Sequence, residues 1–271
     1  MPTLSSNQQG FTLVELVTVI VIIGVLATSI SSFLRFGTQS YTDAADREEL
    51  ISTARFVVER LNREVRNALP NSIRTLGANN QCLEFVPIDK SVIYLDIPVA
   101  PESASNSIDV LMLDEPLLST TQYVAVYALN SDDIYNKVSG VVEAFTSVDN
   151  SGAKQNPSKI NFASNILFKA ESPTERLYFI DSPVSFCLEN NTINRYQAYN
   201  GYDSDGIPNN SATKVLMAEY VDNYSSSGTM IPFQTFPATL QRNGLAISRF
   251  KFVRNLEEIV FNNEIQVPNV P

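Results

Sequence analysis

The feature that most constrains this chain is an uncharged, strongly apolar run near its N-terminus. From Leu16 to Leu34 no residue is charged, and most side chains are Val, Ile or Leu. As a helix that rises ~1.5 Å per residue, this run is about 28 Å long, close to the ~30 Å hydrocarbon thickness of a bilayer. The run therefore predicts a helix that can be embedded in a membrane.

The residues in front of this run form a specific motif. Gly10 is followed by Phe-Thr-Leu-Val-Glu-Leu, so that Glu15 lies one helical turn after Phe11. This order resembles the processing site of type IV prepilins and of the related pseudopilins of type II secretion. The resemblance implies cleavage of the Gly10–Phe11 bond by a prepilin peptidase and N-methylation of Phe11. It also implies that Glu15 guides subunits into a helical filament.

The chemistry of Glu15 agrees with this interpretation. Cleavage would leave a free α-amine on Phe11, and a neighbouring subunit shifted along the bundle could bring its own amine against this carboxylate. Burying an unpaired carboxylate is costly, and pairing recovers much of that cost, so the bond would set the register between subunits. The alternative is that Glu15 lies in the headgroup layer of a plain signal anchor.

The motif and the apolar run predict four segments. Residues 1–10 are a cleaved leader, 11–34 a transmembrane and filament-core helix, 35–69 an amphipathic helix, and 70–271 a β-rich periplasmic head. The leader contains no Lys or Arg. The predicted orientation, a single pass through the bacterial inner membrane before export to an extracellular pilus, therefore rests on the motif and not on charge bias.

The second half of the predicted helix is amphipathic. Its apolar residues recur at steps of three and four, which places them on one helix face, and Pro70 ends the pattern. We therefore expect one helix from Phe11 to Leu69 whose second half packs on the head. The residues on that face are Leu50, Ala54, Val57, Val58, Leu61, Val65 and Ala68.

Beyond Pro70 the pattern is typical of short β-strands separated by polar turns. Together with the long helix, these strands predict an α+β fold in which one or two antiparallel sheets form the head. The expected strands are Ser91–Val99, Ser107–Leu113, Gln122–Leu129, Glu175–Ile180, Val184–Leu188, Lys214–Val221, Leu245–Val253 and Ile259–Val267.

Two cysteines, Cys82 and Cys187, both lie beyond the apolar run. In an oxidising periplasm they can form a disulfide, and two independent buried thiols are the alternative. Two thiolates cannot close a structural zinc site by themselves, so no metal site is expected there.

Composition excludes several functions. The chain has no histidine, which removes Ser-His-Asp and Cys-His catalysis, and no other nucleophile motif is present. We therefore expect no enzyme activity and no cofactor. The net charge of −10 argues against nucleic-acid binding, which needs a concentrated positive surface.

One stretch, Asp203-Ser-Asp205-Gly206, hints at a calcium loop. With Gly206 at the sixth position of an EF-hand loop, Gly201 would be first and Ala212 twelfth, where acidic residues are required. The EF-hand match fails. A calcium site of another shape and a plain Asp-Gly turn remain as alternatives.

Further segments refine the resemblance. Arg66–Arg74, Cys82–Phe85 and Leu216–Val221 are similar to J-type pseudopilins and, more closely, to minor pilins of mannose-sensitive haemagglutinin (MSHA) pili. The resemblance implies a subunit near the pilus tip that helps prime assembly, with other major and minor pilins and an inner-membrane assembly platform as partners.

Two alternative functions remain at this stage. One is a J-type minor pseudopilin of a type II secretion system, and the other is a pilus-borne adhesin. An adhesive surface could be formed by tyrosines that cluster late in the sequence, although we favour core packing and loop anchoring as their role. These are Tyr196, Tyr199, Tyr202, Tyr220 and Tyr224.

Overall fold

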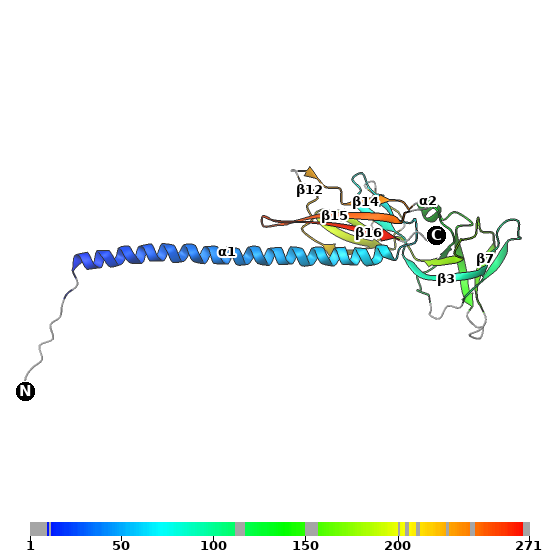
Figure 1. The fold of residues 1–271 in the computed structure, drawn as a ribbon, viewed down its shortest axis with the longest axis horizontal. Helices are drawn as coiled ribbons and strands as arrows, with labels where there is room; N and C mark the ends of the chain where they lie inside the picture. Colours follow the sequence, from blue (N-terminus) through cyan, green and yellow to red (C-terminus); the bar gives the residue numbers. More distant parts are fainter. Residues whose placement is uncertain are drawn as a thin grey trace, which may run out of the picture. The chain divides into compact units, whose positions relative to one another are not determined.

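A computed structural model gives the fold (Figure 1). The residues described are 10, 12–111, 117–149, 157–199, 201–203, 206–209, 212–225, 228–238 and 242–267. The chain divides into two compact units, Met1–Glu49 and Leu50–Pro271, and the division falls inside the first helix.

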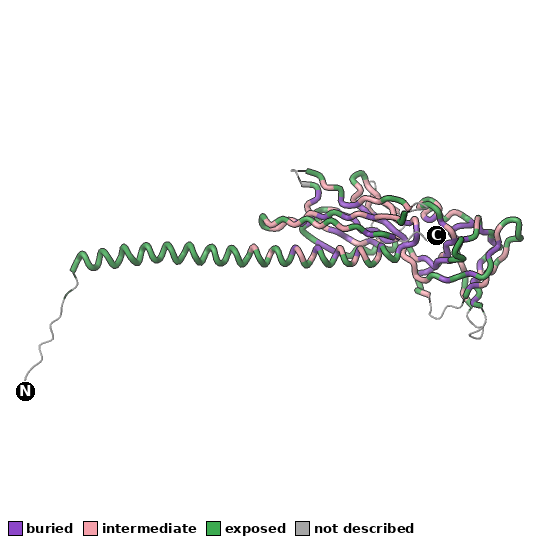
Figure 2. Tube along the Cα trace, in the orientation of Figure 1, coloured by how far each residue is buried: buried purple, intermediate pink, exposed green. Residues whose placement is uncertain are grey.

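Helix α1 runs without interruption from Leu13 to Arg66. Its residues up to Phe36 are exposed, whereas five residues at steps of three and four are fully buried from Leu50 onward (Figure 2). These five, Leu50, Ala54, Val57, Leu61 and Val65, all belong to the apolar face predicted from the sequence.

The predicted end of this helix at Leu69 is wrong by three residues, because α1 ends at Arg66. Ala68 instead forms an antiparallel bridge with Pro87, and the Leu69 amide donates to the carbonyl of Val86 at 2.8 Å. Pro70 disfavours helical backbone in the residue before it. The hydrogen bond to Val86 gives the Leu69 amide a strand partner in place of a helical one.

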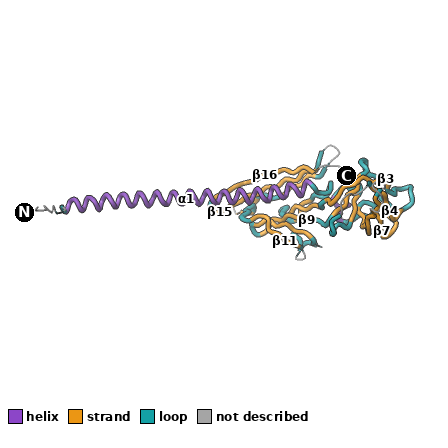
Figure 3. Tube along the Cα trace, turned by 90° about the horizontal axis from the view of Figure 1, so that it is seen from below, coloured by secondary structure: helices purple, strands orange, loops and turns teal. Residues whose placement is uncertain are grey.

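The C-terminal part of α1 packs between two antiparallel sheets (Figure 3). One sheet has five strands in the order β1-β2-β9-β10-β11, and the other has three in the order β14-β15-β16. Their bounds are β1 Arg74–Leu76, β2 Cys82–Phe85, β9 Val184–Glu189, β10 Thr192–Gln197, β11 Thr213–Ala218, β14 Phe233–Phe236, β15 Gly244–Arg254 and β16 Glu257–Val267.

Apolar and polar contacts join the helix to both sheets. Side chains from α1, β2, β9, β15 and β16 share one core cluster that includes Leu61, Phe186 and Phe250. Asn62 on α1 and Asn263 on β16 exchange amide hydrogen bonds at 3.3 and 3.1 Å. The helix therefore packs one face against strands of both sheets and leaves its other face, which includes Phe56, exposed.

The remaining strands close into a barrel in the order β3-β4-β7-β6-β5-β8, with its own apolar core. The sequence predicted one or two sheets, so the barrel was not foreseen. Its strands are β3 Ile88–Asp96, β4 Ser105–Val110, β5 Tyr123–Ala125, β6 Val142–Asp149, β7 Ser158–Ile166 and β8 Arg176–Ile180. Helix α2, Ser131–Tyr135, follows β5, and β12 Tyr224–Ser225 pairs with β13 Gly228–Thr229.

The predicted α+β class, a long N-terminal helix with an antiparallel β-rich head, is confirmed. Strands are present at all eight predicted places. The sequence analysis missed the strands that are very short, fully buried or rich in polar residues, which are β1, β2, β6, β7, β10, β12, β13 and β14.

Candidate functional site

The predicted processing site lies directly before α1. Gly10 is exposed, and a Cβ built on it would meet nothing within 4 Å. Phe11, the predicted methylation site, lies outside the described residues. The structure therefore shows Gly10 itself as exposed, directly before the helix.

Glu15 lies in the first turn of the helix. The Thr12 hydroxyl accepts the Glu15 amide at 3.3 Å, and the Thr12 carbonyl accepts the Leu16 amide at 3.2 Å, so Thr12 acts as the N-cap. A Thr followed three residues later by Glu is the capping-box pattern, and an acidic side chain is favourable near the positive end of the helix dipole. The sequence analysis considered Glu15 for assembly or for the headgroup layer of a signal anchor, and it overlooked this local role.

The first half of α1 presents an apolar surface that no described residue of unit 1 covers. Its large apolar side chains are each between 44% and 78% exposed. Hydroxyls in this half bond to the preceding turn: those of Thr18, Thr28 and Ser29 each donate to a carbonyl at 2.9 Å. Because each of these hydroxyls has its hydrogen bond satisfied within the helix, it does not need a hydrogen bond to water. Within the described residues, α1 is the one helix long and apolar enough to cross a membrane.

Cys82 on β2 and Cys187 on β9 are joined by a disulfide with a Cα–Cα distance of 4.1 Å. The two residues are direct cross-strand partners in the five-stranded sheet, and both are fully buried. The short distance is typical of the non-hydrogen-bonded pairs of an antiparallel sheet, whose side chains lie closest together. The disulfide therefore links two neighbouring strands that are 105 residues apart in the sequence.

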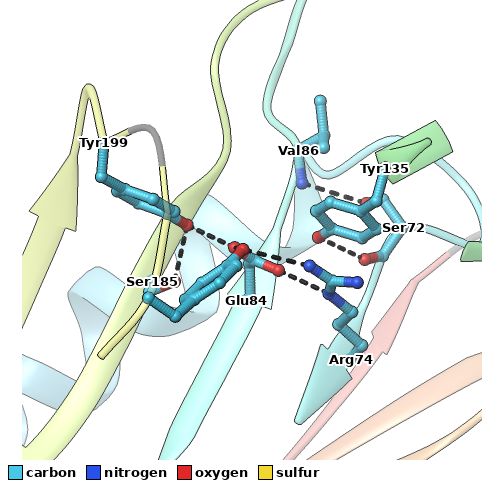
Figure 4. A network of polar contacts seen from close by, with 8 residues as sticks. Ser72, Arg74, Glu84, Val86, Tyr135, Ser185 and Tyr199 are labelled. Carbon is cyan, nitrogen blue, oxygen red and sulfur yellow. Dashed lines mark hydrogen bonds and ion pairs between the residues drawn. The ribbon is translucent and has the colours of Figure 1, made fainter. Parts of the chain in front are cut away.

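A buried polar network lies two residues from this disulfide (Figure 4). The Glu84 side chain on β2 has no exposed surface. Its Oε2 accepts the Arg74 Nε–H at 2.5 Å, and its Oε1 accepts hydroxyls from Tyr199, at 2.5 Å, and Tyr202. One carboxylate thus ties β1 and the segment after β10 to β2.

Aromatic rings and further hydrogen bonds complete the network. The Arg74 guanidinium lies 3.5 Å from the centre of the Tyr135 ring, and the Tyr135 hydroxyl donates to the Ser72 carbonyl at 2.8 Å. The Ser72 hydroxyl accepts the Val86 amide at 3.2 Å. The network therefore also includes α2, the helix that follows barrel strand β5.

These surroundings shift pKa values in directions set by burial and charge. Burial and the negative charge of Glu84 raise the pKa of Tyr199 far above its ordinary value, and they raise that of Tyr202 to about 12. Burial lowers the pKa of Arg74, but the interactions with Glu84, Tyr135 and Tyr202 together outweigh burial, so the pKa of Arg74 is raised. The two tyrosines act as neutral donors and Arg74 as a permanent cation.

Three of the five tyrosines considered as an adhesive surface donate hydrogen bonds within the head, and one of them, Tyr202, is still 40% exposed. Tyr199 and Tyr202 bind Glu84, and the hydroxyl of the buried Tyr196 donates to Glu189. Tyr220 lies under the guanidinium of Arg254, 4.9 Å from ring centre to Cζ. These contacts agree with the loop-anchoring interpretation of the cluster.

The candidate calcium stretch forms a turn where it is described. The Gly206 amide donates to the Asp203 carbonyl at 2.9 Å, and Gly206 has a φ of 82°. A Cβ on Gly206 would lie 2.6 Å from the Gly77 nitrogen, so glycine is required there. Asp205 lies outside the described residues, and no group of three potential metal ligands occurs within the described ranges.

Comparison with known families matches one segment of the chain. Residues 5–31 match the prokaryotic N-terminal methylation motif, and this segment contains Gly10, Glu15 and most of the apolar run. No curated protein and no solved structure matches the chain. The motif indicates a type IV pilin-like protein that is processed by prepilin peptidase, anchored in a membrane and assembled with other pilins into a pilus.

Proposed function

We propose that the chain is a minor pilin, similar to the MSHA minor pilin MshO, that is incorporated near the tip of an MSHA-type pilus. There it helps to prime pilus assembly and surface attachment. The observation that carries the proposal is the methylation motif, residues 5–31, which includes the start of a helix whose first half is exposed and mostly apolar. An apolar surface of this kind must be covered by lipid before assembly and by other helices after assembly.

The proposal assigns each segment a task. Residues 1–10 are the cleaved leader, and 11–34 span the bacterial inner membrane before they enter the filament core. Residues 35–69, whose helical part ends at Arg66, connect to the head. The head, 70–271, lies in the periplasm until the pilus is extruded, and the Cys82–Cys187 disulfide suits that oxidising compartment.

Glu15 supplies the assembly step in this proposal. In the membrane the carboxylate lies at the edge of the span, where water and headgroups reduce its cost. In the filament core it would pair with the methylated amine of Phe11 from a neighbouring subunit. Because leaving either charge unpaired is costly, the pair would select one axial register. The partners are therefore prepilin peptidase, other major and minor pilins and the inner-membrane assembly platform.

Deletion of the gene in its own host tests which machine the chain serves. We expect fewer surface pili by electron microscopy and weaker attachment, with secretion of type II substrates unchanged. Complementation with the wild-type gene should restore pili, whereas a Gly10→Val variant, which blocks cleavage, should not. Loss of secretion with normal pilus numbers would overturn the proposal and identify a J-type pseudopilin. Normal pilus numbers with lost attachment would instead identify an adhesin.

A further inference from the structure

The uncharged run of α1 is bounded by one charged residue on each side. Glu15 precedes the run and Arg35 follows it, with no other charge between them. The two residues are 20 positions apart in one uninterrupted helix, which corresponds to ~30 Å at ~1.5 Å per residue. This separation equals the thickness of the hydrocarbon core, so both charges can lie outside the core at the same time.

Arg35 lies where a positive charge is not expected. Positive residues favour the cytoplasmic side of a membrane, whereas the proposed function places Arg35 on the opposite side, next to the head. In the described part of the chain no ion pair involves Arg35. The nearest carboxylate after it, that of Asp43, accepts a hydrogen bond from the Gln39 amide at 2.7 Å. The Arg35 guanidinium is therefore available to a negative group outside the chain.

Three exposed aromatic side chains lie close to Arg35 along the helix. Phe33, Phe36 and Tyr41 are between 72% and 77% exposed. At about 100° of rotation per residue, Phe33, Tyr41, Arg35 and Phe36 lie at about 0°, 80°, 200° and 300° around the helix axis. A single partner helix or a protein groove would contact one side of α1, whereas lipid surrounds a lone helix on all sides. This distribution therefore favours lipid as the occupant of the surface.

The position of Tyr41 along the axis matches the headgroup layer. Tyr41 is six residues beyond Arg35, a rise of ~9 Å. Helical side chains incline toward the N-terminus, which directs the Tyr41 ring back toward the membrane. The headgroup layer is roughly 5–7 Å thick on each side, given a ~30 Å core in a bilayer of ~40–45 Å. Tyrosine is enriched at this depth because its ring is apolar and its hydroxyl is polar.

We propose that Arg35 and Tyr41 anchor α1 in the phospholipid headgroups on the head side of the membrane, and that Arg35 pairs with lipid phosphate. Arginine binds phosphate through two parallel hydrogen bonds, and its long side chain can extend from the edge of the hydrocarbon to the phosphates. The two anchors fix the depth of the helix before assembly, so that Glu15 is held at the opposite headgroup layer. The proposal rests on the proposed function, because it takes residues 11–34 as a membrane span.

Tryptophan fluorescence measures these depths. The chain contains no tryptophan, so each introduced tryptophan reports on one position. The full chain carries Val25→Trp, Phe36→Trp or Tyr41→Trp and is reconstituted into vesicles of phosphatidylethanolamine and phosphatidylglycerol. One set of vesicles contains lipids brominated near the ends of their acyl chains, and a second set contains lipids with a spin label on the headgroup. Each label quenches only tryptophans that lie at its own depth.

The quenching pattern decides between anchor and span. Val25 is midway between Glu15 and Arg35, so Val25→Trp should be quenched mainly by the acyl-chain bromines. Tyr41→Trp should be quenched mainly by the headgroup label, and Phe36→Trp should be intermediate. Headgroup quenching no stronger for Tyr41→Trp than for Val25→Trp would overturn the anchor alone. Val25→Trp without acyl-chain quenching would show that the run does not span the membrane, which overturns the proposed function and the anchor together.

Substitution of Arg35 tests whether its charge sets the depth. In Arg35→Leu the uncharged run extends to Thr42, and Gln39 is the first strongly polar residue after position 35. We expect this helix to move into the membrane by about one turn, ~5 Å, so that Phe36→Trp shows stronger acyl-chain quenching. Arg35→Lys, the matched control, keeps the positive charge and should keep the wild-type depth. An unchanged quenching pattern in Arg35→Leu would overturn the role of Arg35.

Discussion

The carboxylate of Glu84 accepts a hydrogen bond from Arg74 Nε at 2.5 Å in a site where the Glu84 side chain has no exposed surface. A buried charge of this kind is stable only with its partners in place. Glu84 lies on β2, Arg74 on β1, and two tyrosine donors follow β10. The network therefore makes the folding of distant segments depend on one another.

Removal of Arg74 should be strongly destabilising. Arg74→Ala leaves the Glu84 carboxylate buried without its cation, which typically costs about 3–5 kcal/mol in the free energy of unfolding. Arg74→Lys keeps the charge but loses the planar stacking on Tyr135, so an intermediate loss is expected. Denaturant unfolding of the detergent-solubilised full chain measures both. Arg74→Ala with wild-type stability would contradict the assigned role of the network.

The raised tyrosine pKa values predict sensitivity to alkaline pH. In the unfolded chain a tyrosine loses its proton near pH 10, whereas Tyr202 in the fold keeps its proton to about pH 12 and Tyr199 beyond that. Unfolding therefore releases protons in this window, and the free energy of unfolding falls as pH rises above about 10.

The variant Tyr199→Phe tests this pH dependence. It should lower stability at pH 7, because a hydrogen bond to buried Glu84 is lost, and it should flatten the decline above pH 10. Melting temperatures of the wild type and of Tyr199→Phe, measured at pH 7 and at several values above pH 10, give the decline of stability with pH for each protein. Tyr41→Phe, an exposed position on α1, is the control. An equally steep decline in Tyr199→Phe would show that this tyrosine does not carry the effect.

Loss of the disulfide should destabilise the head under oxidising conditions. The bond closes a loop of 105 residues, and disulfides of that span typically contribute about 2–5 kcal/mol, chiefly by restricting the unfolded chain. Cys82→Ser should lower the melting temperature, and a reductant should lower that of the wild type but not of the variant. An unshifted melting temperature in Cys82→Ser would argue that the bond adds no stability.

Glu15→Val should separate processing from assembly. The substitution leaves Gly10 and the rest of the helix start in place, so cleavage should stay largely intact. Assembly should be crippled, because no carboxylate is left to pair with a neighbouring amine. Immunoblots of the mature form and counts of pili measure the two steps. Wild-type pilus numbers in this variant would exclude a role for Glu15 in assembly, whereas a loss of cleavage would assign Glu15 to peptidase recognition.

Local sequence patterns predicted the helix well and the long-range contacts poorly. The exposed half of α1 and its buried face from Leu50 could be predicted, because each shows as a local pattern of apolar residues along a single helix. Strand β2, Cys82–Phe85, was missed because all four residues are buried, including Glu84, so it shows no alternation. A buried glutamate gives no signal of its own in a sequence.

The barrel and the polar network could not be predicted for the same reason. The partners of Glu84 lie 10 residues away at Arg74 and 115 and 118 residues away at Tyr199 and Tyr202. Such pairings depend on strand order, and single-sequence patterns do not give strand order. The clustering of tyrosines after β10 was the one available sign, and it indicated only that this segment is anchored or binds something.

The mass of the intact protein tests the central claim most directly. The chain is extracted from membranes of cells with and without an active prepilin peptidase, and its mass is measured without digestion. We predict a chain that begins at methylated Phe11 only when the peptidase is active, and one that retains residues 1–10 otherwise. A chain that begins at Met1 in both samples would contradict the account, and it would make this protein a simple signal-anchored protein.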